Sequence, residues 1–271
     1  MEKMKRLLLL FTVLIINGPL LGQSALATEP ILLTEDQQIA LTSADRFISY
    51  DAYGQLYWIN KSTLYKTGAQ GNFEFQELML GPITHVDVQN PLTVLIFYRE
   101  TNTLVYLDNR LNEKKRIDFN LIPEFPQAQW IFNAGSNRLW IMDQNSQRLW
   151  IYDTQKMQII FESPPLPNVI ALKCRFNDCI AQTTEELIHL SLYGTITKRK
   201  AFNQGSLADY NDQFLIVSRE NTLFDLNSNQ ALNFPEIRLE NQINDLQLTQ
   251  DFLYIYDSNV IRRFPLKSIK Q

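Results

Sequence analysis

Hydrophobic and polar positions alternate along this chain in short runs that are separated by polar turns. The clearest example is the stretch from Ile83 to Asn112, where ITHVDV, TVLIFY and TLVYLD are divided by Asn90-Pro91 and by Glu100-Thr101-Asn102. Dense β-branched and aromatic residues between turn-forming residues are typical of an antiparallel meander. The polar run KKRIDF (114–119) then predicts a fourth, outer strand.

Weaker copies of this four-strand pattern recur along the chain. Units are predicted over residues 47–78, 83–119, 128–163, 171–202, 206–234 and 243–266. The centres of their second strands are spaced by 39, 44, 40, 35 and 39 residues, at Trp58, Phe97, Ile141, Ala181, Ile216 and Ile255. A period near 40 with four short strands per unit indicates a β-propeller blade. Runs such as RLWIMD and RLWIYD are apolar on both faces, as strands of stacked blades would be.

The sixth unit has three strands, and the N-terminal part of the chain has two strand candidates before the first unit. Pairing Ile31–Thr34 or Gln38–Thr42 with the sixth unit would complete it and cover its edge. We therefore predict an all-β, six-bladed β-propeller closed by an N-terminal strand, as a single domain over residues 28–271. Seven blades is the alternative if the N-terminal part contains more sheet.

Residues 1–27 have the layout of a secretory signal peptide. A basic start (MEKMKR) precedes an apolar run from Leu7 to Ile16, and Ala25-Leu26-Ala27 supplies a small-residue cleavage motif. The apolar run is short for a bilayer span, which disfavours an uncleaved anchor. We expect an exported protein, periplasmic or associated with the outer membrane, with no membrane span after cleavage.

Net charge narrows the classes of partner. The whole chain carries a formal charge of −4, which becomes −6 once Lys3, Lys5, Arg6 and Glu2 are removed with residues 1–27. A mildly acidic chain has no electrostatic reason to bind nucleic acid or an anionic membrane surface.

The third-strand sequences LWIYD and LVYLD resemble those of the NHL, YWTD and quinoprotein-like propellers. The stretch from Gly81 to Asn112 also resembles exported propellers of bacterial envelopes. The resemblance implies the propeller fold over the mature chain and carries no assigned activity.

Candidate site residues fall on the predicted innermost strands, which line the central channel of a propeller. His85 and Asp87 lie on that strand of the second unit, and Asp45, Asp209 and Asp245 hold comparable positions in other units. Converging carboxylates would be able to hold Ca²⁺ through oxygen ligands. The alternative is that they are channel-wall residues or strand-end caps. No HxH or HExxH spacing supports a zinc hydrolase, and no serine-nucleophile motif is present.

Two cysteines, Cys174 and Cys179, flank the four-residue turn RFND between two predicted strands. Opposite positions of an antiparallel pair bring side chains within disulfide range, so we predict a disulfide in an oxidising compartment. The alternatives are a C-x₄-C redox site and a lone metal-binding pair.

Two function hypotheses follow. The first is a non-enzymatic scaffold or assembly factor of the bacterial envelope, monomeric by itself, which binds an envelope protein partner. The alternative is an enzyme or a small-ligand or glycan binder that uses the central channel. The four tryptophans could form a glycan platform, but at blade-repeat positions they are expected in the core between blades.

Overall fold

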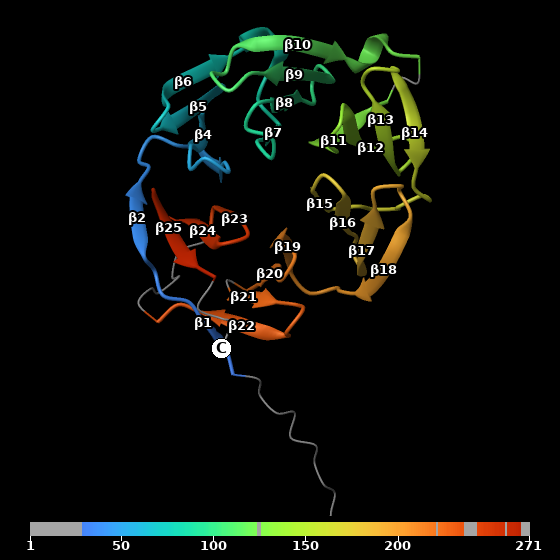
Figure 1. Cartoon of the computed structure of the whole chain (residues 1–271). Coiled ribbons are helices and arrows are strands. Elements are labelled where there is room, and N and C mark those ends of the chain that lie inside the picture. Colours follow the sequence, from blue (N-terminus) through green and yellow to red (C-terminus); the bar gives the residue numbers. More distant parts are fainter. Residues whose placement is uncertain (1–28, 124–125, 221, 236–242, 258, 267–271) are drawn as a thin grey trace, which may run out of the picture.

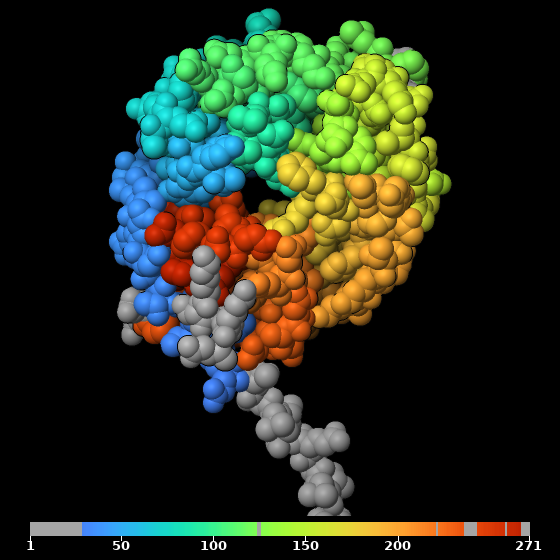
Figure 2. All heavy atoms as spheres, viewed as in Figure 1, coloured from blue at the N-terminus to red at the C-terminus, as the bar shows by residue number. Residues whose placement is uncertain are grey.

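A computed structural model describes residues 29–123, 126–220, 222–235, 243–257 and 259–266. Within these residues the strands form six sheets arranged in a ring, with β7, β11, β15, β19 and β23 nearest the centre (Figure 1). The fold is a six-bladed β-propeller, as predicted, and the seven-blade alternative is not realised. Figure 2 shows the ring hollowed at its centre.

Five blades contain four consecutive antiparallel strands. Their bounds are β3 (Arg46–Tyr50), β4 (Leu56–Asn60), β5 (Thr63–Gly68) and β6 (Gly71–Gln76) in blade 1; β7 (His85–Asp87), β8 (Val94–Tyr98), β9 (Thr103–Leu107) and β10 (Glu113–Asp118) in blade 2; β11 (Ala128–Asn133), β12 (Arg138–Asp143), β13 (Arg148–Asp153) and β14 (Gln158–Glu162) in blade 3; β15 (Ala171–Cys174), β16 (Asp178–Gln182), β17 (Glu186–Ser191) and β18 (Ile196–Ala201) in blade 4; and β19 (Ser206–Tyr210), β20 (Leu215–Arg219), β21 (Thr222–Asp225) and β22 (Gln230–Asn233) in blade 5. The sixth blade contains β23 (Asp245–Leu248), β24 (Phe252–Asp257) and β25 (Val260–Pro265).

The hydrophobic core lies between adjacent blades. All five residues of β8 and all five of β9 are buried, which matches their apolar character on both faces. Between blades 3 and 4, Trp140 and Met142 of β12 pack in one cluster with Leu172 and Ile188 of the next blade. Each blade therefore buries both faces of its middle strands against its neighbours.

Ring closure depends on the N-terminal part of the chain. Strand β2 (Gln37–Ala40) pairs antiparallel with β25 and completes the sixth blade, as predicted for this region. Beside this ladder, Glu35 pairs with Arg262 at 2.8 Å, and Asp36 pairs with Arg263 at 2.9 Å.

The other N-terminal candidate, Ile31–Thr34, does not pair with the sixth blade. Strand β1 (Ile31–Leu32) runs parallel to β22 on the outer edge of blade 5 instead of joining blade 6. The next residue, Leu33, is buried in the core between blades 5 and 6. This N-terminal segment thus holds two blades together.

The disulfide is present. Cys174 and Cys179 are register partners in β15 and β16, with Cα atoms 4.1 Å apart. The predicted signal peptide, residues 1–27, lies outside the described residues. Among the described residues, no helix has the length and apolar character that a bilayer crossing requires.

Candidate functional site

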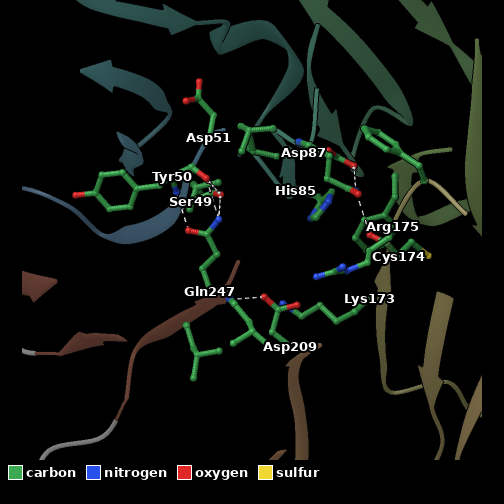
Figure 3. A pocket seen from close by; sticks show the side chains of 18 of the residues that line it. Ser49, Tyr50, Asp51, His85, Asp87, Lys173, Cys174, Arg175, Asp209 and Gln247 are labelled. Carbon is green, nitrogen blue, oxygen red and sulfur yellow. Dashed lines mark hydrogen bonds between the residues drawn. The ribbon is translucent and has the colours of Figure 1, made fainter. Parts of the chain in front are cut away.

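The central channel has a volume of about 560 Å³ and is lined by residues of the inner strands. His85, Asp87, Asp209 and Asp245 all lie in its wall, so the structure brings together four of the five predicted positions. Figure 3 shows the first three of them. Other lining side chains that the sequence analysis did not single out are Arg46, Ser49, Lys173, Arg175, Gln89 and Gln247.

Asp45 is a correction to the prediction. It precedes β3 and is not a channel-lining residue. Its carboxylate accepts a hydrogen bond of 2.5 Å from the backbone N–H of Lys61, which has a positive φ of 55° in the turn between β4 and β5. Asp45 therefore stabilises a turn within its own blade.

Asp87, Asp209 and Asp245 share one arrangement in the channel wall. Each accepts a backbone N–H from the innermost strand of the following blade: Asp87 from Asn133 at 2.8 Å, Asp209 from Leu248 at 2.8 Å, and Asp245 from Phe47 at 2.9 Å. Charged acceptors make the stronger hydrogen bonds of proteins. These carboxylates therefore join blade 2 to blade 3, blade 5 to blade 6, and blade 6 to blade 1.

An amide side chain two positions after each aspartate adds a second bond between blades. Gln247 accepts from the backbone N–H of Tyr50 at 2.7 Å and donates to its carbonyl at 2.9 Å. Asn211 donates to the carbonyl of Thr249 at 2.8 Å. Gln89 donates to the carbonyl of Cys174 at 3.0 Å, which lies in blade 4. We call this pattern of Asp, any residue and an amide the channel clamp.

The channel clamp occurs as Asp87-Val88-Gln89, Asp209-Tyr210-Asn211 and Asp245-Leu246-Gln247. Asp245 and Gln247 lie two apart on β23 and so point to the same side, whereas Gln89 and Asn211 lie just beyond the ends of β7 and β19. The sequence signal for the amides was therefore this repeated triplet, which the sequence analysis missed because it considered the carboxylates alone.

His85 is held as a neutral imidazole. Burial is the main cause that lowers its pKa to about 3, and the nearby charges of Lys173 and Arg46 lower it further. Its ring packs edge-on against Phe132, with centroids 4.4 Å apart, and its buried Nε2 has no hydrogen-bond partner among the described residues. In this state the side chain contributes packing to the wall.

Metal binding gains no support from the geometry. Across the described ranges, no three His, Cys, Asp or Glu residues gather closely enough to hold a metal ion. Burial raises the pKa of the Asp87 carboxyl, while hydrogen bonds from Asn133 and Gln89 oppose the shift. Burial likewise raises the pKa of Asp245. The tryptophans do not line the channel; Trp140 and Trp150 are buried.

Exposed apolar side chains lie on the face that carries the connections between successive blades. Two 3₁₀ turns, η1 (Leu78–Leu80) and η2 (Phe119–Leu121), occupy matching places after blades 1 and 2. They expose Leu78 by 66%, Met79 by 87% and Leu121 by 80%. We call these three side chains the apolar rim.

The apolar rim stands on a well-bonded backbone. The side chains of Glu77 and Asp118 accept the N–H groups of Met79 and Asn120 at the start of each turn. Thr101, in the turn between β8 and β9, donates to the carbonyl of Leu80 at 3.1 Å and accepts from Asn120 at 3.1 Å. One turn of blade 2 thus links η1 to η2.

Comparison with known proteins gives the fold. No family model and no curated protein sequence matches the chain. Among solved structures, BamB from Moraxella catarrhalis superimposes with a TM-score of 0.53 at 9% identity, over 86% of this chain and 100% of that one. A chain of a mitotic checkpoint complex gives 0.56 at 7% identity, over 97% and 99%. BBS1N, solved in complex with ARL6DN, gives 0.55 at 10% identity, over 88% and 97%.

These three structural similarities concern the fold. All are to propeller-containing structures of comparable length, and all lie far below the identity at which function is shared. The likeness establishes the fold alone.

Proposed function

We propose that this protein is a non-enzymatic interaction scaffold of the bacterial cell envelope, which binds a partner protein through the apolar rim. The observation that carries the proposal is the exposure of Leu78, Met79 and Leu121 on two turns that Thr101 joins. Because the backbone beneath these side chains is already ordered, a partner that covers them orders only the side chains and not the backbone. Methionine is enriched in the buried centre of protein interfaces.

Polar groups frame the apolar rim. Arg116 of β10 bonds to Glu113 at 2.7 Å and to Glu77, the residue that caps η1, at 3.1 Å. An apolar centre with charged surroundings is the usual composition of a protein interface. The partner expected from this chemistry is a folded protein with an apolar pocket or groove.

The central channel supports the alternative function less well. The predicted aspartates Asp87, Asp209 and Asp245 are engaged with backbone N–H groups of neighbouring blades, which gives them a role in the ring itself. The envelope location rests on the signal peptide predicted for residues 1–27 and on the disulfide, a bond typical of oxidising compartments. BBS1N was solved with ARL6DN bound, which shows that a chain of this fold can engage a protein.

The test places a photo-crosslinking amino acid at Met79, at Leu121 or at Tyr53 in the exported protein of intact cells. Tyr53 is the matched control, since it is 61% exposed and lies in the turn between β3 and β4, on the opposite face. We expect Met79 and Leu121 to give adducts with the same protein in the envelope fraction, and Tyr53 to give none.

The double variant Met79→Lys/Leu121→Lys extends the test. It should lose co-purification of that partner, because two charges would have to be desolvated at the interface, while its melting temperature stays that of the unmodified protein. Equal adducts from Tyr53, or a double variant that still co-purifies with the partner, would contradict the proposal.

A further inference from the structure

A second cavity of about 610 Å³ lies between blades 2 and 3. It opens on the face opposite the apolar rim, because the turns between the first and second strands of blades 2, 3 and 4 contribute to it. Gln89 and Phe176 line both this cavity and the central channel, so they form the wall between the two. We call it the blade 2–3 groove.

The blade 2–3 groove has a charge opposite to that of the chain. Lys114, Lys115 and Arg138 line it, and no aspartate or glutamate does, although the chain carries a net charge of −4. The channel beside it is lined by six aspartates and by only three basic residues. Positive charge is therefore concentrated in one concave site.

The three cations differ from the adjacent Arg116 in their acidic neighbours. In the part of the chain that the structure describes, none of them forms an ion pair, whereas the adjacent Arg116 pairs with two glutamates. Asp153 is the register partner of Arg138. Its carboxylate accepts the N–H groups of Lys156 and Gln155, which lower its pKa, and the charge of Arg138 acts in the same direction, so Asp153 offsets part of that charge. Lys115 lies over the ring of Tyr106 with its Nζ 4.4 Å from the centroid, which places its charge at the wall of the groove.

The remaining lining offers hydrogen bonds and one flat apolar surface. Asn90, Thr93 and Asn137 supply amide and hydroxyl groups, while the hydroxyl of Thr154 donates to the carbonyl of Asn137. Phe176 packs beside Gly135, where a Cβ atom would lie 3.8 Å from it. The turn that follows is closed by a 2.8 Å bond from the N–H of Arg138 to the carbonyl of Gly135, so the position of Arg138 is fixed.

We propose that the blade 2–3 groove binds a saccharide that bears an anionic group, either a carboxylate or a phosphate ester. Arg138 and the two lysines take the anionic group, the amides and hydroxyls take the sugar hydroxyls, and Phe176 packs against the sugar ring. The volume lies within the range of pockets for small ligands, roughly 300–1,000 Å³. This inference goes beyond the proposed scaffold function and does not depend on it.

The test is isothermal titration calorimetry of the purified protein at low ionic strength, where screening is weakest. The probes are glucuronate, glucose 6-phosphate, glucose and inorganic phosphate. We expect at least one of the two acidic sugars to bind. Glucose should bind at least about tenfold more weakly because it lacks the charged hydrogen bonds, and inorganic phosphate at least about tenfold more weakly because it lacks the contacts of the sugar ring and its hydroxyls. Which acidic sugar binds more tightly separates the carboxylate from the phosphate ester.

Substitutions locate the site. Arg138→Gln and, separately, the exposed Lys114→Gln should each weaken binding of the acidic sugar by about tenfold. Lys198→Gln is the matched control, because Lys198 is exposed on the outer strand of blade 4 and the change in net charge is the same. It should leave binding unchanged, as should the rim variant Met79→Lys/Leu121→Lys.

Several results would overturn the inference. Absence of binding by both acidic sugars would do so, as would glucose or inorganic phosphate binding as tightly as they do. The site would be wrong if Lys114→Gln, in a protein with an unchanged melting temperature, weakened binding no more than Lys198→Gln.

Discussion

At the scale of single residues, the channel aspartates show that one position can suit two different roles. An inner-strand carboxylate is equally suited to a cation or to a backbone N–H, and the sequence contains no sign of which is nearby. The N–H donors here come from residues 46, 39 and 198 positions away from Asp87, Asp209 and Asp245. The sequence placed these side chains at the channel, but their partners depend on how the blades stack.

Replacing Asp87 with alanine should lower the free energy of unfolding by about 2 kcal/mol, because the buried N–H of Asn133 and that of Gln89 would lose their acceptor. Urea denaturation measures the change. Glu74→Ala, on the exposed outer strand of blade 1, is the control and should have almost no effect. If both variants unfold at the same urea concentration, the channel clamp does not stabilise the ring.

His85 should make the stability fall as the pH is lowered. The unfolded histidine binds a proton near its ordinary pKa of 6.5, whereas the folded side chain resists protonation until about 3. The contribution of His85 to stability is therefore fully present above pH 6.5 and is lost as the pH falls from 6.5 toward about 3. The loss is at most about 1.4 kcal/mol per pH unit for this group. Burial also lowers the pKa of His189, which acts in the same direction.

The measurement compares urea midpoints of the unmodified protein and of His85→Gln at about pH 7 and about pH 5. Glutamine does not titrate, so the variant should lose less stability between the two pH values and keep the part that His189 contributes. An equal loss in both proteins would mean that His85 is not held neutral by the fold.

At the scale of strands and turns, the hydrophobic pattern predicted the middle strands of the blades well. Strands β8, β9, β12 and β13 are nearly all buried, and burial on both faces leaves a strong signal in the sequence. The N-terminal strands were harder, since β1 and β2 are short and their partners lie at the other end of the chain. The turns η1 and η2 were missed because their leucines look like the continuation of a strand.

Strand β2 should be essential to the closed ring. A protein that starts at Ser43 lacks β1 and β2 and leaves the edges of β25 and β22 unpaired, so we expect Tm to fall by about 10 °C or more and the protein to associate. Calorimetry and size-exclusion chromatography measure the two effects against a protein that starts at Glu29.

A control separates the strand from its ion pairs. Glu35→Gln/Asp36→Asn keeps the β2 ladder and removes the charged partners of Arg262 and Arg263. The free energy of unfolding should fall by about 1 kcal/mol or less for each ion pair lost. If the Tm of this double variant falls as far as that of the truncated protein, the ion pairs and not the strand close the ring.

At the scale of the whole molecule, different chemistry is found in different regions of the surface. One face carries the apolar rim, the channel is acidic, and the blade 2–3 groove on the other face is basic. The blade count was predictable because the repeat period is local to each unit. The basic groove was not predictable from the sequence. Net charge is a sum over the whole chain, and Arg138 comes close to Lys114 and Lys115 only because blades 2 and 3 stack.

Closure of the sixth blade by β2 also has a consequence for the order of events during synthesis. Glu35 and Asp36 are made early, yet Arg262 and Arg263 follow 227 positions later, so the last blade cannot be completed until nearly the whole chain is available. A nascent or interrupted chain would present two open sheet edges, which invite aggregation and capture by chaperones or proteases. Only a chain that contains both β2 and β25 can therefore pair these edges and close the ring.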